Sequence, residues 1–331
     1  MSTTIVVGGF FGDEGKGKII SYLALKDKPS LIVRGGAGPN AGHTVKDGKK
    51  IYKIRMLPSG FLNKMAKLLI GPGVVVNPDV FLRELNEFGA KGRAFLDSHC
   101  GIIEEHHIKK DSELKQKIGS TGSGTGPANA ERAMRTLKLA KDVPELAAYV
   151  ADVPSLINIA LEANEKVLIE GTQGTFLSLW HGTYPYVTSK EVTASGICAD
   201  VGIGPKTVDE VIVVFKSYVT RVGSGPLTEE LSQEEIERRG WSEFGTVTGR
   251  PRRASDFNFD LAKRAVVLNS ATQIAVTKLD VRFPVCTGTK SYNELTSEAK
   301  TFIENIENQL KVPVTIIGTG PEIYDIIDRR K

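Results

Sequence analysis

The chain has 331 residues, of which 40% are hydrophobic and 25% are charged, a composition typical of a globular protein. Its formal net charge is only +4, which gives no general attraction to nucleic acid or to a membrane surface. No apolar run approaches the roughly 20 residues of a membrane-spanning helix, and the three cysteines (100, 198 and 286) fit neither a zinc motif nor a disulfide framework. Because the sequence opens directly into a predicted strand without a signal peptide, we expect a cytoplasmic protein.

Short apolar segments alternate with helical segments along the chain. The pattern predicts strands at 4–7, 31–33, 68–70, 167–169, 211–215, 274–276 and 314–317, with helices at 80–88, 131–141, 156–163, 260–269 and 294–309. This alternation is typical of an α/β fold, here a single large domain (1–331) with a central, mostly parallel sheet flanked by helices. Glycine-rich loops at the carboxyl ends of such strands gather into one ligand-binding crevice.

The first such loop, residues 8–18, lies between the strand at 4–7 and a helix. Glycines allow a close approach of the backbone to phosphate, and a helix N-terminus favours an anion. The loop departs from the Walker pattern, because Gly17 stands where that pattern has a hydroxyl and an acidic residue, Asp13, lies inside the loop. Asp13 is therefore a candidate to contact a metal, a phosphate and a reacting group. An ordinary glycine-rich turn with surface charges would have a similar sequence.

Further glycine-rich loops follow the later strands. The loop at 34–44 contains Asn40 and His43, and a histidine can donate a proton near neutral pH, although a lone histidine is often an ordinary surface or core residue. The loops at 118–128 and 169–205 are rich in hydroxyls, and the second is long enough without a clear pattern to suggest function. His99, His106 and His107 fit no metal motif, and we expect them on a solvated face.

Two basic loops lie at 220–226 and 246–253. The second places Arg250, Arg252 and Arg253 within four positions. Such a cluster can be a nucleic-acid patch, but the near-neutral chain favours a pocket for a small anion.

The strand at 274–276 leads into Thr-Lys-Leu-Asp, ending at Asp280. An aspartate at a strand end can accept hydrogen bonds from guanine N1–H and N2–H₂, whereas adenine has no such donor pair. With a phosphate loop elsewhere on the sheet, this predicts a P-loop-like GTP-binding architecture.

Seven motifs occur in the order of one known family. They are 12–18 (GDEGKGK), 40–44 (NAGHT), 170–175 (EGTQGT), 181–188 (HGTYPYVT), 220–223 (TRVG), 248–253 (TGRPRR) and 277–280 (TKLD). From residue 4 to about 321 the chain resembles the adenylosuccinate synthetases, the GTP-dependent IMP–aspartate ligases of purine synthesis. Two other hypotheses stay open: another GTP-using enzyme or switch protein, and a nucleic-acid binder that uses the three arginines.

The resemblance implies a reaction in two steps through 6-phosphoryl-IMP. Asp13 is the implied base that removes the N1 proton of IMP, and His43 is the implied acid on the β-phosphate side. It also implies one Mg²⁺ per subunit, held by Asp13 and the Gly42 carbonyl, and a homodimer in which Arg135 reaches the partner's site. No nucleic acid and no membrane would be bound.

The resemblance also implies three sets of contacts. For GTP they are Gly12, Asp13, Glu14, Gly15, Lys16, Gly17, Lys18, Gly42, His43, Thr44, Arg252, Lys278, Leu279, Asp280, Gly318, Thr319 and Gly320. For IMP they are Asp13, Glu14, Gly15, Lys16, Asn40, Ala41, Gly42, His43, Thr121, Arg135, Gln173, Thr188 and Arg250. For L-aspartate they are Thr246, Val247, Thr248, Gly249, Arg250 and Arg252.

The chain departs from the family pattern in a few places. It is shorter than most members, chiefly around 90–118, 136–155 and after Asp280. Val247 replaces a threonine of the aspartate loop, which removes a hydroxyl, and Gly318 stands where a serine often lies against guanine. Ser120 replaces a threonine, and Pro251 an arginine.

Overall fold

The computed structural model describes residues 3–244, 249 and 251–330. Within them, ten strands form one sheet. In order across the sheet they are β16 (Ile326–Asp328), β15 (Val314–Gly318), β14 (Gln273–Thr277), β11 (Glu210–Lys216), β1 (Thr3–Gly8), β10 (Val167–Glu170), β2 (Leu31–Arg34), β5 (Lys67–Ile70), β7 (Ala94–Asp97) and β9 (Val150–Ala151). Every neighbouring pair is parallel except β16 and β15, the two strands at one edge, which are antiparallel. The predicted α/β fold with a mostly parallel central sheet is confirmed.

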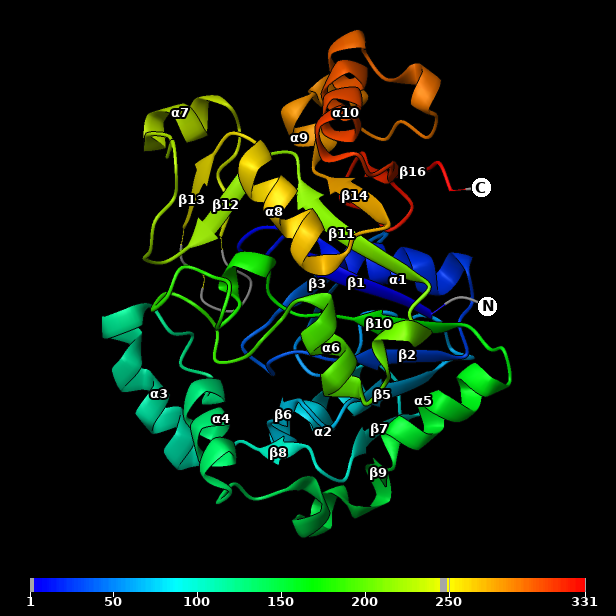
Figure 1. Cartoon of the computed structure of the whole chain (residues 1–331), viewed down its shortest axis with the longest axis vertical. Helices are drawn as coiled ribbons and strands as arrows, with labels where there is room; N and C mark the ends of the chain where they lie inside the picture. The colour runs from blue at the N-terminus through cyan, green and yellow to red at the C-terminus, as the bar shows by residue number, and fades with distance from the viewer. Residues whose placement is uncertain (1–2, 245–248, 250, 331) are drawn as a thin grey trace.

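Helices surround this sheet, and three short strand pairs extend from it. The helices are α1 (Lys16–Lys26), α2 (Pro78–Glu87), α3 (Glu105–Ile118), α4 (Thr125–Met134), α5 (Val153–Glu162), α6 (Ala194–Val201), α7 (Gln233–Arg238), α8 (Phe259–Asn269), α9 (Leu279–Arg282) and α10 (Ser297–Leu310). The strand pairs are β3 (His43–Asp47) with β4 (Lys50–Ile54), β6 (Val75–Val76) with β8 (Gly101–Ile102), and β12 (Val219–Val222) with β13 (Arg252–Ser255). In Figure 1, α3 and α4 lie at the lower left, β12 and β13 at the upper left, and both termini on the right.

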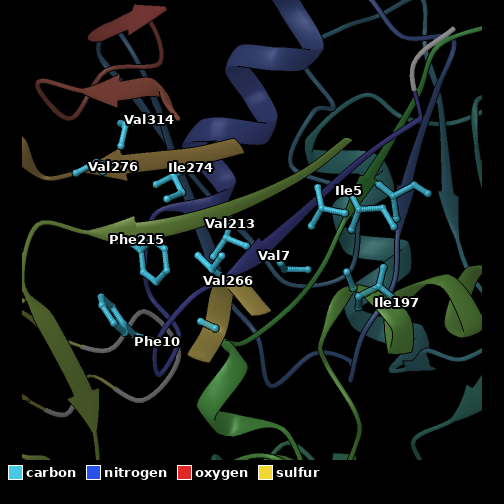
Figure 2. Close-up of a cluster of buried hydrophobic side chains, with 14 of the residues drawn as sticks. Ile5, Val7, Phe10, Ile197, Val213, Phe215, Val266, Ile274, Val276 and Val314 are labelled. Carbon is cyan, nitrogen blue, oxygen red and sulfur yellow. The ribbon is translucent and has the colours of Figure 1, made fainter. Parts of the chain in front are cut away.

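The sheet is buried on both faces because successive side chains of each strand point to opposite sides. Ile5 and Val7 of β1 belong to one apolar cluster, which includes residues of α5, α6, α8 and α10. Val6 belongs to the other, which includes residues of α1 and α2. Figure 2 shows part of the first cluster, with Val213 and Phe215 of β11 beside β1. The two clusters hold the carboxyl ends of the strands in fixed positions.

All seven predicted strands are present, as β1, β2, β5, β10, β11, β14 and β15. One helix prediction was wrong: instead of 131–141, α4 spans Thr125–Met134 and ends where Arg135 adopts a left-handed φ of 65°. Four helices were missed: α3 in a polar stretch, α6 inside the long loop at 169–205, and the short helices α7 and α9. Among the described residues, no helix is long and apolar enough to cross a membrane.

Candidate active site

A cavity of about 970 Å³ lies where the loops that follow β1, β2, β10, β14 and β15 meet. This is the edge at which parallel α/β sheets bind ligands. Most of the predicted site residues line it: Gly12, Asp13, Gly15, Lys16, Gly17, Lys18, Asn40, Ala41, Gly42, His43, Thr44, Thr121, Gln173, Thr188, Arg252, Lys278 and Gly320. Segments that are far apart in sequence, from residue 12 to residue 320, therefore share one cavity.

Other predicted residues do not line this cavity. Glu14, Leu279, Gly318 and Thr319 are buried, Asp280 is partly buried, and Arg135 and Gly249 are exposed. Thr246, Val247, Thr248 and Arg250 lie outside the described residues. Of the six residues predicted to contact L-aspartate, the structure therefore describes Gly249 and Arg252.

The loop between β1 and α1 contains an unusual backbone conformation at Asp13. Its φ is 60°, in the left-handed region that an aspartate seldom adopts, between Gly12 at 85° and Gly15 at 88°. Such conformations concentrate at functional sites. Gln173 and Lys278, two other predicted residues that line the cavity, have φ values of 54° and 59°.

Glu14 faces the inside of its own loop rather than the cavity. Its Oε1 accepts hydrogen bonds from the backbone N–H groups of Phe10 and Gly12 at 3.0 and 2.9 Å. Its Oε2 pairs with Lys16 Nζ at 2.8 Å, and both side chains are buried. The Glu14 carboxylate therefore shapes the loop and orients Lys16, a role that the sequence did not indicate.

The missing Walker hydroxyl has a steric explanation. A Cβ atom at Gly17 would lie 2.9 Å from the Cβ of His43, closer than real Cβ atoms come to other atoms. Glycine at this position lets the first turn of α1 pack directly against the start of β3. The phosphate loop and the candidate acid are thereby brought together.

Replacing Gly17 with serine should lower kcat/KM for GTP, the substrate that the sequence predicts, by about 10-fold, since overpacking costs about 1–3 kcal/mol and displaces His43. Steady-state kinetics would measure this change. Gly204→Ser is the matched control, because nothing lies within 4 Å of a Cβ at that glycine. Equal kinetics for the two variants would contradict this steric account.

Asp13 pairs across the cavity wall with Arg252 of β13, Nη2 to Oδ2 at 3.0 Å. Arg252 Nη1 also pairs with Glu243, a cavity-lining residue that the sequence did not indicate. Glu243 further accepts from Lys216 Nζ at 2.8 Å and from the Tyr218 hydroxyl at 2.5 Å. Burial would raise the pKa of Glu243, but Lys216 and the other neighbouring cations lower it overall, so the carboxylate stays charged.

Asp280 comes two residues after the cavity-lining Lys278 but does not itself line the cavity. Its Oδ1 is buried and makes no hydrogen bond to any described residue. A buried polar atom without a partner is costly, so this oxygen is available to a ligand donor. Burial raises the pKa of Asp280, and Lys278 and Lys18 oppose that rise.

Lys18 makes contacts other than those predicted. Its Nζ donates to the carbonyl oxygens of Gly320 and Asp325 at 2.6 and 2.7 Å, and burial lowers its pKa to about 8. Lys18 therefore ties α1 to the last loop. A Cβ at Gly318 would lie 3.2 Å from this Nζ, a tight contact that a small shift of the lysine side chain would relieve.

The opposite wall carries neutral polar groups. Asn40 Nδ2 donates to Thr188 Oγ1 at 3.3 Å, which joins the loops after β2 and β10. Asn40 Oδ1, Gln173 Nε2 and Thr125 Oγ1 are buried and have no hydrogen-bond partner among the described residues. All three residues line the cavity, so they offer one acceptor, one donor and one hydroxyl to a polar ligand. Sequence reasoning missed Thr125.

The arginine cluster at the second basic loop is not a free cationic patch where it is described. Arg252 pairs with Asp13 and Glu243, and Arg253 pairs with Glu230 at 2.7 Å. Arg253 also donates to two backbone carbonyls. These pairs argue against a nucleic-acid surface built on the two side chains.

We expected His99, His106 and His107 on a solvated face, but this was wrong for His107. His107 is fully buried, and its Nδ1 accepts from the backbone N–H of Glu104 at 2.9 Å. Its Nε2 must then carry the proton, and it lies 2.9 Å from Glu131, which also contacts His106. The three side chains are close enough for a metal, but a protonated Nε2 cannot ligate one. The cluster therefore joins α3 to α4.

Comparison with known proteins points to one family. A family model described as adenylosuccinate synthetase matches residues 5–143 and 136–287. A relative of that name from Methanocaldococcus jannaschii is 58% identical over 336 residues, covering 100% of this chain and 97% of the relative. One from Archaeoglobus fulgidus is 55% identical over 335 residues, covering 100% and 99%.

Solved structures agree with this similarity. Fully ligated adenylosuccinate synthetase from Plasmodium falciparum superposes with a TM-score of 0.93 at 28% identity, and both chains are covered completely. A succinoaminodeoxyadenylate synthetase from cyanophage S-2L, bound to dGMP and dATP as an energy donor, has a TM-score of 0.83 at 25% identity, covering 100% of this chain and 96% of the other.

Proposed function

The chain belongs to the adenylosuccinate synthetase family, and we propose that Asp13 and His43 carry out its chemistry. It is a GTP-dependent ligase that converts IMP, L-aspartate and GTP to adenylosuccinate, GDP and phosphate, in AMP biosynthesis. The observation that carries the residue assignment is the meeting of both side chains in one cavity, Asp13 from within the glycine-rich loop and His43 from the start of β3.

In the first proposed step, the Asp13 carboxylate removes the N1 proton of IMP. The electron pair moves to the 6-oxygen, which bonds to the γ-phosphorus of GTP while the bond to the β–γ bridging oxygen breaks. Negative charge then develops on the β-phosphate, and a hydrogen bond donated by His43 stabilises it. In the second step the amine of L-aspartate bonds to C6, the bond between C6 and the 6-oxygen breaks so that phosphate leaves with that oxygen, and the nitrogen releases a proton to solvent.

Asp13 and the Gly42 carbonyl are the proposed ligands of one Mg²⁺. Both residues line the cavity, and oxygen donors are the ligands that Mg²⁺ prefers. When bound, the ion would neutralise charge on the phosphate oxygens. The 26% exposure of the Asp13 side chain leaves its carboxylate accessible from the cavity.

The remaining contacts are proposed from the same cavity. Asn40, Thr121, Gln173 and Thr188 would hold IMP on the neutral wall, and Arg252 would meet L-aspartate or GTP. The glycine-rich loop and Lys278 would hold GTP. The sequence-based assignments to residues 246–248 and 250, a single domain over 1–331, and a cytoplasmic location stay predictions.

An absorbance assay of adenylosuccinate formation tests the overall function. Product should require IMP, L-aspartate, GTP and Mg²⁺ together. Absence of product with all four present would contradict the function, and GTP hydrolysis independent of IMP and aspartate would favour a switch protein or another GTPase.

Asp280→Asn should lower kcat/KM for GTP by about 10- to 100-fold, because hydrogen bonds to a charged group contribute about 1.5–3 kcal/mol. An asparagine amide can instead donate to the 2-oxygen of xanthine, so XTP should become a better substrate. Kinetics with GTP, XTP and ATP would measure the preference. An unchanged ratio of GTP to XTP would contradict the guanine assignment.

We also propose a homodimer in which Arg135 acts in the partner's site. Arg135 is exposed at the end of α4 and does not line its own chain's cavity. An equal mixture of the separately weak Asp13→Asn and Arg135→Leu proteins should then regain about a quarter of wild-type activity, since half of the dimers are mixed and each has one intact site. If Arg135 acted within its own chain, the mixture would regain nothing.

A further inference from the structure

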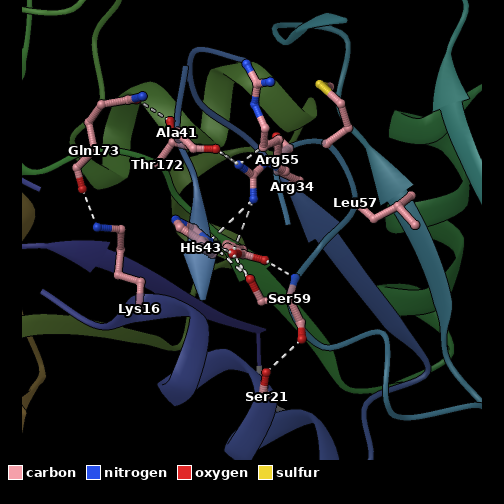
Figure 3. A network of polar contacts seen from close by, with 12 residues as sticks. Lys16, Ser21, Arg34, Ala41, His43, Arg55, Leu57, Ser59, Thr172 and Gln173 are labelled. Carbon is pink, nitrogen blue, oxygen red and sulfur yellow. Dashed lines mark hydrogen bonds and ion pairs between the residues drawn. The ribbon is translucent and has the colours of Figure 1, made fainter. Parts of the chain in front are cut away.

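Behind the cavity lies a carboxylate that none of the proposed chemistry uses. Glu170 is the last residue of β10, and its side chain is fully buried. Its Oε1 contacts His43 Nδ1 and accepts from Ser59 Oγ at 2.6 Å, and its Oε2 accepts from Ser59 N at 2.6 Å. Figure 3 shows His43 within this network, between Arg34 and Ser59. Four elements of the fold therefore meet at one carboxylate.

The charge of Glu170 determines which nitrogen of His43 carries a proton. Burial would raise the pKa of Glu170, but His43, Arg34 and the Ser59 hydroxyl lower it to about 2. An ionised carboxylate can only accept hydrogen bonds, so Nδ1 of His43 must donate. The other ring nitrogen, Nε2, is then the one that can act on a ligand in the cavity.

Arg34 is not the main partner of the buried Glu170 carboxylate. Its Nη1 lies 3.4 Å from Glu170, whereas its Nη2 donates to the carbonyls of Ala41 and Arg55. The shorter contacts of Glu170 go to His43 and Ser59. Ser59 in turn follows a segment whose backbone N–H groups at 55–57 donate to the buried Glu84. Ser59 is therefore held by its own hydrogen bonds to Glu170 and by the anchoring of the preceding segment to Glu84.

We propose that Glu170 is a positioning residue for His43: its contact with Nδ1 fixes the orientation of the ring and leaves Nε2 as the nitrogen that can act on a ligand. This rests on the proposed role of His43 in the ligase reaction. A carboxylate that holds the distal nitrogen of a catalytic or ligating histidine commonly has this function. Ser59, which donates twice to Glu170, holds the carboxylate in place.

The test is a double-mutant cycle with Glu170→Gln and His43→Asn. Glu170→Gln should lower kcat by about 10- to 100-fold, as loss of such supporting residues does. The KM values for GTP, IMP and L-aspartate should stay within twofold of wild type. In the His43→Asn background the same change should lower kcat less than twofold further, because the group that Glu170 positions is gone.

Asp97→Asn is the matched control, since Asp97 is a buried carboxylate that accepts from the backbone N–H groups of His99 and Val153 and does not contact His43. Its effect on kcat should be the same with either residue at position 43. If Glu170→Gln does not fold, as judged by circular dichroism and thermal melting, Ser59→Ala decides in its place through the same cycle.

The outcomes separate the two proposals. Effects of Glu170→Gln and His43→Asn that multiply would overturn the positioning role and leave that of His43 intact. Wild-type kcat in His43→Asn would overturn the role of His43 itself.

Discussion

Asp13→Asn is expected to lower kcat by about 10²–10⁴-fold, the usual contribution of a positioned general base. The amide is nearly isosteric with the carboxylate but cannot take the N1 proton of IMP. It also loses the charge that pairs with Arg252 at 3.0 Å. Steady-state kinetics at saturating IMP, L-aspartate and GTP would measure kcat, and the KM values would report on binding.

The control for this substitution is Asp260→Asn on the surface. Asp260 lies in the first turn of α8, and its side chain is 97% exposed. Its removal should leave kcat unchanged, since such surface changes usually have small effects. A kcat for Asp13→Asn within a few fold of wild type would refute the assignment of Asp13 as the base.

The position of Asp13 illustrates what the sequence could predict. The apolar strand at 4–7, the glycines and the helix that follows were sufficient to predict a phosphate loop with a carboxylate inside it. The left-handed backbone of Asp13 was not predictable, because an aspartate seldom adopts it, and neither were the hydrogen bonds from the loop to Glu14. Hydrophobic periodicity and composition indicate which secondary structure a segment prefers, but they do not indicate the orientation of a carboxylate side chain.

The failures elsewhere have similar physical causes. The helix predicted at 131–141 ended at residue 134 because Arg135 adopts a left-handed conformation that its side chain does not encode. Helix α3 was missed because it is largely polar, although Leu114 and Ile118 line the cavity. Glu243 was missed since its partners, Lys216, Tyr218 and Arg252, come from distant segments.

Three buried or nearly buried carboxylates share one arrangement. Glu14 pairs with Lys16, Glu170 contacts His43, and Glu243 pairs with Arg252. In each case a basic side chain lines the cavity while its acidic partner limits its movement from the protein side. Catalytic electrostatics depend on groups that do not need to reorganise during the reaction. The three carboxylates hold the basic side chains in place. Glu14 and Glu170 do so without adding a negative charge to the cavity wall, whereas Glu243 itself lines the cavity.

His43→Asn is expected to lower kcat by about 10²–10³-fold, the usual cost of losing one donor that stabilises developing negative charge. Asparagine is shorter than histidine, so its amide cannot reach the position of Nε2 from the start of β3. Burial lowers the pKa of His43, and Glu170 opposes that change. Because Nδ1 donates to Glu170, Nε2 can donate to the β-phosphate only when the imidazole carries a second proton.

The measurement is kcat at saturating substrates, together with GTP binding by calorimetry. Binding should change little, because the lost interaction strengthens only in the transition state. His99→Asn is the matched control, as the His99 side chain is 63% exposed and does not line the cavity. If His43→Asn retained kcat within twofold, or lost GTP binding in proportion to kcat, the charge that develops on the β-phosphate would have to be stabilised by other groups.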